Sequence, residues 1–466
     1  MKAFTPRPFQ SEGIDFLLNN SRCGLWWEPG IGKTPTVASA IEILYNSLDV
    51  HRVLVVAPLE VARSTWPREF AKWEHLARIP RLFVHHTNPT ERARMLLTEK
   101  SAVHIVSYET FKWAVKLFKN AKRWPYDMVV FDEGTKMKSP SSKTFYAARA
   151  ISKLTNVRRI VILTGTPAPN GLVDIWAPTF VLDHGVALEV EFEKRLHRKS
   201  SMAFKYAMFR PVNRMHTKWK PLTGTEEWIY DRVRGLYSAK RARVELGLPN
   251  EIPPHDTLID LPAKVRAQYR QLERELFVEL ERGVDIEAVN KGVLSNKLRQ
   301  ICNGAAYYDE SRSWASLHDE KLAALEELAG SVTEPLLVAY EYAFDAQRLK
   351  KKFGDDFTIW DGRAETEDAW NKKLLPMMGA NPQQVAHGMN WQEGSNHTAW
   401  FGLPWNYELY AQFNERLGDT RQFQSNTGLR GIVHRLIARD TVEDSIVAAA
   451  LADKQSVEDA LMEAVS

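Results

Sequence analysis

The sequence predicts an α/β protein with two parallel-sheet domains and a helical, basic insert between them. The first third contains four short apolar runs: VLVVA (53–57), VHIVS (103–107), MVVF (128–131) and IVIL (160–163). Runs without period-two alternation are typical of strands covered on both faces, as in a parallel sheet between helices. A second set of runs begins at LLVAY (336–340) and continues through LLPMM, TAWFG and GIVHRLI.

The domain boundaries follow from changes in composition along the chain. At 466 residues, the chain is too long for one ordinary core, since domains usually have about 100 to 200 residues. We expect a first domain over residues 1–184, the insert over 185–330 and the second domain over 331–466. The strongest amphipathic helix of the insert is AKVRAQYRQLERELFVELERG (263–283), and a helical tail follows from Val442.

The bulk composition favours a soluble protein of the cytoplasm. Apolar residues make up 44% of the chain and charged residues 26%, which is ordinary for globular proteins. Cys23 and Cys302 lie far apart without metal-ligand neighbours, so neither a disulfide framework nor a zinc site is implied. The start lacks the apolar core of a signal peptide, and no apolar run has the length of a membrane span.

The stretch WWEPGIGKTP (26–35) is a candidate phosphate-binding loop. Gly30 and Gly32, on either side of Ile31, allow the backbone to approach phosphate oxygens. Lys33 supplies a positive charge, and Thr34 supplies a hydroxyl for magnesium. The residues that follow place apolar side chains on one helical face: Val37, Ala40, Ile41 and Leu44.

Two features of this loop depart from the usual eight-residue pattern. Trp27 occupies the position of a glycine, and we expect both tryptophans to pack the corner between strand and loop rather than to stack on a base. Pro35 is compatible with the first turn of a helix, where its missing N–H costs little.

An acidic pair follows one of the predicted strands. Asp132 and Glu133 come directly after MVVF, at the strand end where open α/β sheets bind ligands. Asp132 can hold the magnesium shell, and Glu133 can polarise an attacking water. The Gly-Lys-Thr loop, with Lys33 as the phosphate contact, and the strand followed by Asp132 and Glu133 together predict hydrolysis of a nucleoside triphosphate.

The order of these motifs resembles that of the Swi/Snf-type branch of superfamily 2 helicase-like ATPases, over most of the chain. PRPFQSEGIDFLL (6–18) is similar to the leading glutamine motif, which implies that Gln10 contacts the adenine edge with Arg7 beside it. VAPLEVARSTWPREFAKW (56–73) is similar to the next motif, which touches a nucleic-acid strand. The resemblance implies two RecA-like domains, ATP and Mg²⁺ as cofactors, and movement on DNA, usually double-stranded. It is strongest to short members from bacteria and their viruses, which places the protein in a bacterial cell or in infected host cytoplasm.

Three further stretches carry the resemblance. FDEGTKMKSPSSKTFYAA (131–148) resembles the Asp-Glu-x-His box, with Thr135 where histidine is usual. LTGTPAPN (163–170) is similar to the motif that links nucleotide state to domain motion. The hydroxyl groups of this motif belong to Thr164 and Thr166, and we predict that both residues take part in nucleic-acid binding. SNKLRQICNG (295–304) resembles the helical stretch before the second motor domain.

The last two motifs lie in the second half. HGMNWQEG (387–394) and LPWNYELYAQFNERL (403–417) resemble the fifth motif and the start of the sixth, which assigns Gly388 to nucleotide binding. The sixth motif normally presents two arginines three residues apart, but here Arg421 follows Arg416 by five residues, with Phe423 where glycine is expected. We interpret this as a two-residue insertion that leaves Arg421 as the arginine finger across the interdomain cleft. The alternative is that Arg421 is a solvated loop residue.

A basic stretch in the insert is a candidate for extra nucleic-acid contacts. From Lys194 to Lys220 there are nine Lys or Arg residues and no Asp or Glu. Trp219 or Phe209 can stack on bases there. The alternative of similar weight is a solvated surface whose aromatics pack against the first domain. The predicted phosphate contacts are Lys199, Lys205, Arg210 and Arg214.

Three functions stay open at this point. The first is an ATPase that moves along duplex DNA. The second is a helicase that separates the strands of DNA or RNA. The third is a slow, nucleotide-gated DNA-binding module that acts with a protein partner in replication, recombination or repair.

Overall fold

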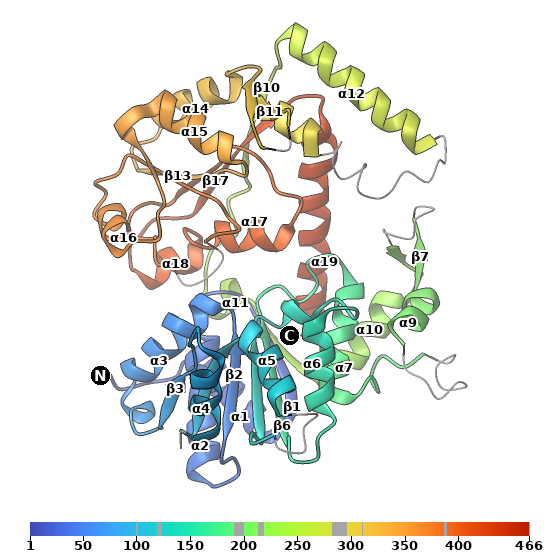
Figure 1. Ribbon diagram of the computed structural model, residues 1–466, viewed down its shortest axis with the longest axis vertical. Helices are drawn as coiled ribbons and strands as arrows, with labels where there is room; N and C mark the ends of the chain where they lie inside the picture. Colours follow the sequence, from blue (N-terminus) through green and yellow to red (C-terminus); the bar gives the residue numbers. More distant parts are fainter. Residues whose placement is uncertain are drawn as a thin grey trace. The chain divides into compact units, whose positions relative to one another are not determined.

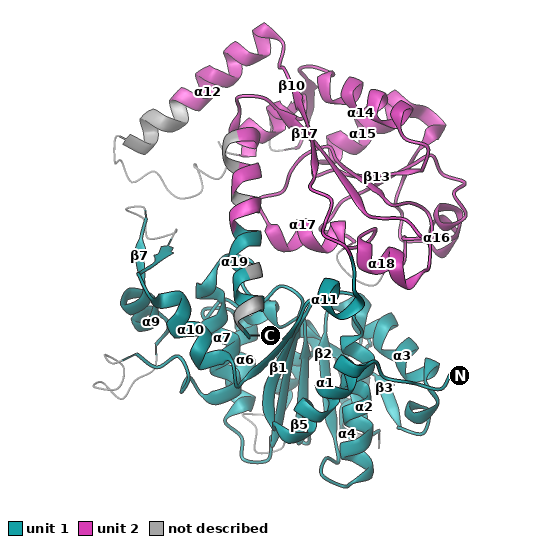
Figure 2. Cartoon of the chain, turned by 180° about the vertical axis from the view of Figure 1, so that it is seen from behind, with its two compact units in different colours: residues 1–248, 454–466 teal, residues 249–453 magenta. Residues whose placement is uncertain are grey.

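The chain forms two compact units (Figure 1). The computed structural model describes residues 1–98, 101–118, 124–190, 200–212, 219–281, 296–309, 311–385 and 389–465. Unit 1 comprises Met1–Leu248 together with Lys454–Ser466, and unit 2 comprises Pro249–Asp453 (Figure 2). Lys199, Arg214 and Gly388 of the predicted sites lie outside the described residues.

A parallel sheet of seven strands forms the centre of unit 1, in the order β3-β4-β2-β5-β6-β1-β9. The four apolar runs of the first third all form strands of this sheet, as predicted. The strands are β1 (Arg22–Trp27), β2 (Val53–Ala57), β3 (Arg81–Phe83), β4 (Val103–Ser107), β5 (Met128–Asp132), β6 (Arg159–Thr164) and β9 (Tyr237–Lys240).

Helices cover both faces of this sheet. Successive residues of a strand enter opposite cores, so that Val53 and Val55 face one side while Leu54 and Val56 face the other. One core includes residues of α1, α2 and α3, and the other includes residues of α5, α6 and α7. The helical elements of unit 1 are α1 (Pro8–Asn19), α2 (Lys33–Asn46), η1 (Val61–Thr65), α3 (Trp66–Lys72), η2 (Glu74–Leu76), α4 (Pro89–Thr98), α5 (Tyr108–Leu117), η3 (Gly134–Met137), α6 (Lys143–Ser152), η4 (Leu172–Ile175), α7 (Trp176–Asp183), α9 (Ser201–Met208), α10 (Thr225–Val233) and α11 (Ala242–Leu246).

Unit 2 is built around a second parallel sheet, of six strands in the order β10-β17-β16-β13-β15-β14. Apolar side chains from its two faces enter two separate cores. Its strands are β10 (His255–Ile259), β13 (Leu336–Ala339), β14 (Phe357–Ile359), β15 (Met377–Ala380), β16 (His397–Trp400) and β17 (Ile432–Ala438), with a hairpin of β11 (Ala305–Tyr307) and β12 (Trp314–Ser316) beside them. Two parallel-sheet α/β domains are thus confirmed.

The helices of unit 2 include the long amphipathic helix that the sequence predicts. It is α12, and it is followed by a helical stretch over residues 296–302 within the SNKLRQICNG segment. The elements are α12 (Ala263–Glu281), α14 (Glu320–Ser331), α15 (Ala343–Phe353), η5 (Gly354–Asp356), α16 (Ala364–Asn371), α17 (Tyr407–Asn414), α18 (Asp419–Gln424), η6 (Glu443–Ala448) and the start of α19 (Ala449–Val465).

The compact units differ from the three predicted ranges, because the insert is shared between the two sheets. Its strand β9 pairs with β1 of the first sheet, and its strand β10 pairs with β17 of the second. A hairpin of β7 (Phe209–Pro211) and β8 (Trp219–Pro221) belongs to unit 1. The end of α19 also returns to unit 1, where Leu461 and Met462 join a core cluster.

Among the residues that the structure describes, no helix combines the length and the apolar character that a membrane crossing requires.

Candidate active site

The predicted phosphate loop connects β1 to α2. Gly30 has a φ of 83° and Gly32 a φ of 91°, which is the left-handed region that glycine adopts without steric cost. The helix begins at Lys33, so Pro35 lies in its first turn as expected. The N-terminus of α2 therefore faces the loop, and the dipole of a helix favours an anion at that end.

The two tryptophans before the loop pack inside unit 1, as predicted. Trp26 stacks on Tyr237 with ring centroids 3.9 Å apart. Trp27 is fully buried and donates its indole N–H to Ser238 at 3.2 Å. A Cβ added at Gly13 of α1 would come within 2.4 Å of the Trp27 ring. Trp27 therefore fixes the approach of α1 to the start of the loop.

Lys33 is held by the loop that precedes it. Its Nζ donates to the carbonyl oxygens of Trp27 at 2.6 Å and Glu28 at 3.2 Å. Its positive charge also acts to lower the pKa of Asp132, against the larger effect of burial.

Gln10 supports the loop from α1. Its Oε1 accepts from the backbone N–H of Arg7 at 2.9 Å, and its Nε2 donates to the carbonyl of Ile31 at 3.2 Å. A Cβ at Gly32 would lie 2.4 Å from this Nε2, so only glycine allows the contact. Arg7 is exposed at the N-cap of α1. The adenine contacts of Gln10 and Arg7 remain predictions.

Asp132 ends β5 as a buried carboxylate. Its Oδ2 accepts from the Trp66 indole N–H at 2.8 Å. Burial raises the pKa of Asp132, while the Trp66 hydrogen bond and the charge of Lys33 act in the opposite direction. Tyr108 fixes the backbone here, because its hydroxyl donates to the carbonyl oxygens of Asp132 at 2.9 Å and Glu133 at 3.1 Å.

Glu133 has an unusual backbone conformation and a carboxylate held by two hydroxyls. Its φ of 63° and ψ of 62° lie in the left-handed region, which is rare and strained outside glycine. Its Oε1 accepts from Thr135 and from Thr164, each at 3.1 Å. The Thr164 hydroxyl in turn accepts from the Thr166 backbone N–H at 3.1 Å. Thr135, where histidine was expected, therefore positions the candidate base.

These hydrogen bonds bear on the prediction that Thr164 and Thr166 bind a nucleic acid. Both are buried, with 3% and 6% of their surface exposed. Since Thr164 contacts Glu133 directly, its placement supports a link between the acidic pair and β6 rather than direct contact with a nucleic acid. In the sheet, β6 lies between β5 and β1, so the loop, Thr164 and the acidic pair lie at the carboxyl ends of three neighbouring strands.

The donor set near this edge fits magnesium. Thr34 and Asp132 offer a hydroxyl and a carboxylate, the hard oxygen ligands that Mg²⁺ prefers. In the described part of the chain, no group of three or more His, Cys, Asp or Glu side chains could hold a metal ion. Mg²⁺ is usually bound by one or two carboxylates together with substrate phosphates, so the pair is sufficient when phosphates complete the shell.

Unit 2 brings the two arginines of the sixth motif together. Arg416 is buried and donates to the carbonyl of Met389 at 3.3 Å, while Arg421 donates to Asn390 Oδ1 at 3.3 Å. Burial and the nearby charge of Arg421 lower the pKa of Arg416 to about 9, and burial lowers that of Arg421. Arg421 is partly buried on α18 rather than on a solvated loop.

The basic stretch of the insert separates into buried and exposed parts. Phe204 and Phe209 are buried in a core of unit 1, so the prediction that Phe209 stacks on a base is wrong. Trp219 is partly exposed, with the Nζ of Lys205 lying 5.3 Å from its ring centroid. Arg210 is exposed on β7.

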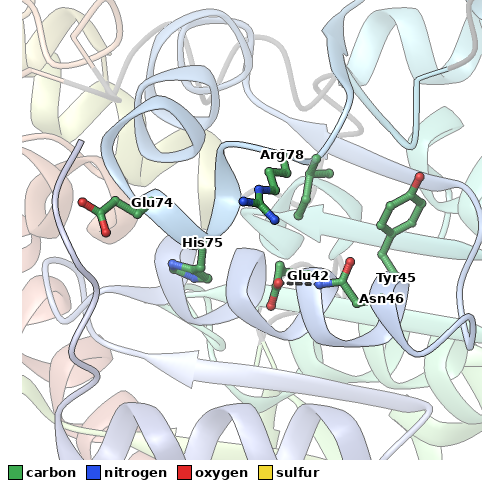
Figure 3. Close-up of a pocket in the computed structure, with 7 residues that line it drawn as sticks. Glu42, Tyr45, Asn46, Glu74, His75 and Arg78 are labelled. Atoms are coloured by element: carbon green, nitrogen blue, oxygen red, sulfur yellow. Dashed lines mark hydrogen bonds between the residues drawn. The ribbon is translucent and has the colours of Figure 1, made fainter.

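A pocket of about 390 Å³ lies at the other end of α2 (Figure 3). Its lining includes Glu42, Glu74, His75 and Arg78. The carboxylates would repel phosphates, and no glycine lines it. The helix rises about 1.5 Å per residue, which places Glu42 on the order of 14 Å along the axis from Lys33. This pocket is therefore separate from the phosphate loop.

Sequence inspection missed the residues that hold the site from a distance. Trp66, Tyr108 and Ser238 showed no local signal of their own, because each acts through hydrogen bonds with residues far away in the chain. Trp66 was visible only as part of the VAPLEVARSTWPREFAKW motif.

The chain is similar to known proteins over its whole length. Protein p41 of Acyrthosiphon pisum secondary endosymbiont phage 1 is 35% identical over 476 residues, which cover 100% of this chain and 99% of p41. The DNA excision repair protein ERCC-6-like of Bos taurus is 32% identical over 178 residues, which are 36% of this chain and only 14% of that protein. The Sulfolobus solfataricus SWI2/SNF2 ATPase core in complex with dsDNA is 17% identical, covering 99% of this chain and 96% of that chain with a TM-score of 0.45.

A family model described as the SNF2-related domain matches residues 9–305. The match contains the phosphate loop, the acidic pair and Thr164, and it spans more than half of the chain. The protein therefore belongs to the SNF2-related family and contains an ATPase core of that family.

Proposed function

We propose that this protein is a DNA-stimulated, Mg²⁺-dependent ATP hydrolase that moves along duplex DNA. The observation that carries the proposal is the group at the carboxyl ends of β1, β6 and β5. There a glycine loop, Lys33, the buried Asp132 and the positioned Glu133 come together. Family membership supports ATP as the nucleotide.

The chain binds the triphosphate with backbone and side-chain groups of unit 1. The N–H groups around Gly30, Ile31 and Gly32 and the N-terminus of α2 accommodate the phosphates. Lys33 moves from its carbonyl partners to the phosphate oxygens, and Gln10 holds the loop in register. Thr34 and Asp132 hold Mg²⁺, which when bound neutralises charge on the phosphates.

Glu133 orients and polarises the attacking water. For this role its carboxylate must face the phosphate, and hydrogen bonds from Thr135 and Thr164 define its direction. The orientation of this carboxylate affects the rate of hydrolysis, because phosphoryl transfer is catalysed mainly by orientation and electrostatics. We propose that Arg421, with Arg416 beside it, supplies positive charge to the reacting phosphate.

DNA as the track is supported by the relatives. The DNA repair and recombination protein RAD54B of Homo sapiens is 30% identical over 41% of this chain, although the match covers 22% of that protein. The partly exposed Lys205 and the exposed Arg210 support contact with a phosphate backbone. The names of these DNA repair and recombination relatives also support a protein partner in replication, recombination or repair.

Steady-state ATP hydrolysis tests this proposal. The rate is measured without nucleic acid, with single-stranded DNA, with duplex DNA and with RNA, at fixed salt, beside Lys33→Ala. We expect strong stimulation by duplex DNA that the variant abolishes. A rate near zero under all conditions, with DNA affinity that depends on nucleotide, would instead support the slow gated module.

A second assay separates movement from unwinding. Displacement of a protein roadblock from duplex DNA, without displacement of a strand from a fork, is expected of a translocase. Unwinding of the fork without roadblock displacement would favour the helicase.

A further inference from the structure

The pocket at the far end of α2 is a cavity that the candidate nucleotide site does not use. Its volume of about 390 Å³ lies within the usual range for small-ligand sites, about 300–1,000 Å³. Two segments of unit 1 line it (Figure 3): α2 contributes Glu42, Tyr45 and Asn46, and the turn after α3 contributes Glu74, His75, Arg78 and Ile79. Its size and its largely polar lining suit a small polar molecule.

The charged side chains around this pocket have both signs and do not neutralise one another. Glu42 is half-buried, whereas Glu74 and Arg78 are exposed. Within the described part of the chain, the Arg78 guanidinium and the Glu74 carboxylate form no hydrogen bond or ion pair. Oε1 of Glu42 accepts from the Asn46 amide, which leaves Oε2 for a ligand. Ligand groups of either charge therefore find a partner here.

His75 adds an acceptor nitrogen to the lining. Its Nε2 lies 2.8 Å from the Ser39 hydroxyl oxygen, which donates to the Pro35 carbonyl at 2.8 Å. A hydroxyl has one proton, so Ser39 accepts the second hydrogen bond and His75 Nε2 carries the hydrogen. Burial lowers the pKa of His75, and the ring is neutral at pH 7. Nδ1 is then an acceptor, and the ring is held in place because it stacks on Phe4 with centroids 5.3 Å apart.

The combination of these groups restricts the class of ligand. A purely anionic ligand would meet two carboxylates, and a purely cationic ligand would meet the Arg78 guanidinium. An ammonium group has three N–H donors for the carboxylate oxygens and the imidazole nitrogen. A carboxylate matches the planar fork of a guanidinium. Ile79, only 3% exposed, and the Tyr45 ring supply an apolar wall for the rest of the ligand.

We propose that this pocket binds a small zwitterion of the amino-acid class. Its carboxylate pairs with Arg78, and its ammonium donates to three acceptors, Glu42, Glu74 and Nδ1 of His75. This inference goes beyond the proposed function, because the pocket is separate from the phosphate loop and the ligand takes no part in hydrolysis.

Ligand-observed NMR on the full chain, without ATP or DNA, tests the proposal. Saturation-transfer difference spectra are recorded with each standard amino acid in turn, and titrations give the Kd of those that bind. We expect saturable binding of at least one amino acid. Absence of saturable binding by every one of them up to about 10 mM would overturn the proposal.

A substitution at the guanidinium tests the carboxylate contact. Arg78→Ala should weaken binding by about tenfold to a hundredfold, as for loss of one hydrogen bond to a charged group. Because Arg78 is exposed, the fold should tolerate this change. Arg68→Ala is the matched control, since Arg68 of α3 is also exposed and is not among the lining residues. Equal binding by the Arg78→Ala variant and the unchanged protein would contradict the assigned site.

Modified ligands separate the two charges. The N-acetyl derivative of a bound amino acid lacks the ammonium, and its amide lacks the carboxylate, so each should bind at least about tenfold more weakly than the parent. Glu42→Gln should weaken the parent more than the N-acetyl derivative, and Arg78→Ala should weaken the parent more than the amide. Equal binding of the parent and either derivative would show that one charge is not recognised, which would overturn a zwitterion site.

These measurements are independent of the proposed hydrolysis, because they contain no nucleotide and no DNA. A protein that fails the ATPase assay can still bind the zwitterion, and an active ATPase can lack this binding. Failure of one proposal is therefore distinguishable from failure of the other.

Discussion

The two units use the same edge of the same kind of sheet in opposite ways. In unit 1, the carboxyl ends of β1, β5 and β6 lead into a glycine loop and an acidic pair, the group that we propose as the nucleotide site. In unit 2, the ends of β13, β16 and β17 are filled by ion pairs within the protein. Lys321 donates to Glu443 at 2.7 Å, with the two side chains only 1% and 2% exposed.

Further hydrogen bonds and ion pairs within the protein occupy the same edge of unit 2. Lys321 also donates to Asn303 at 3.0 Å and to the Phe401 carbonyl at 2.8 Å, and Glu443 accepts from the Ala438 N–H at 3.0 Å. Arg299 adds a pair with Glu341. The comparison teaches that the fold offers a binding edge, but side chains decide whether that edge holds a ligand or closes the protein.

The largest effect should come from Arg421, the arginine of unit 2 that we propose as the finger. We expect Arg421→Ala to lower ATP turnover by about three to five orders of magnitude, as for loss of an arginine finger. Arg363→Ala, at an arginine whose side chain is 76% exposed, is the matched control. Single-turnover kinetics measure the rate at which bound ATP is hydrolysed. An unchanged rate in Arg421→Ala would show that Arg421 is not the arginine finger.

The next effect tests the acidic pair of unit 1. We expect Glu133→Gln to keep ATP binding and to lose about two to four orders of magnitude in turnover, the usual contribution of a general base. The amide oxygen can still accept from Thr135, so the fold should persist. Binding of a fluorescent nucleotide beside the hydrolysis rate separates the two effects, and normal turnover would exclude Glu133 as the base.

Breaking the edge of unit 2 should affect stability instead. Lys321→Met leaves Glu443 as an uncompensated buried charge, which should cost about 3–5 kcal/mol of unfolding free energy. The exposed pair of Lys352 and Glu326, 2.7 Å apart, provides the control, since Lys352→Met should cost about 0–1 kcal/mol. Urea denaturation measures both. Adding Glu443→Leu should restore part of the loss, because it removes the unpaired charge but leaves the Ala438 N–H without its acceptor. Equal costs for the two lysines would contradict a structural role for this edge.

The same edge should give unit 2 a pH-dependent stability. Burial raises the pKa of Asp345 to about 7, so between about pH 4 and 7 the folded state binds a proton that the unfolded state releases. This group's contribution is therefore fully present below pH 4 and is lost as pH rises toward 7, by at most about 1.4 kcal/mol per pH unit. Asp345→Asn should flatten the pH profile of the unfolding midpoint, and a parallel profile would contradict the assignment.

The smallest effect concerns the position of Glu133. Thr135→Val removes one hydrogen bond to the carboxylate, which is worth about 0.5–1.5 kcal/mol, so turnover should fall by about twofold to tenfold. Thr135→Ser keeps the hydroxyl and should restore the rate. A loss of the same size in both variants would indicate that packing, rather than the hydroxyl, positions the base.

Local patterns were sufficient for the core strands and for the glycine turn between β1 and α2. The apolar runs predicted the buried strands, since side chains covered on both faces are mostly apolar. Gly30, Lys33 and Asp132 could be proposed as site residues because the roles predicted for them depend on residue type at a fixed place relative to a strand or helix end. The edge strands β9 and β10 were missed, because YSAK and HDTLI lack such a run and are held mainly by pairing with one neighbour.

The sequence by itself determined the two-sheet architecture, the family and the chemical groups of the site. Only the tertiary structure decided which groups meet. Thr164 reaches Glu133 across 31 residues, Trp66 reaches Asp132 across 66, and Lys321 reaches Glu443 across 122. The physical reason is that local sequence restricts backbone conformation and burial, whereas a hydrogen bond between distant residues exists only when packing brings both partners to the same edge.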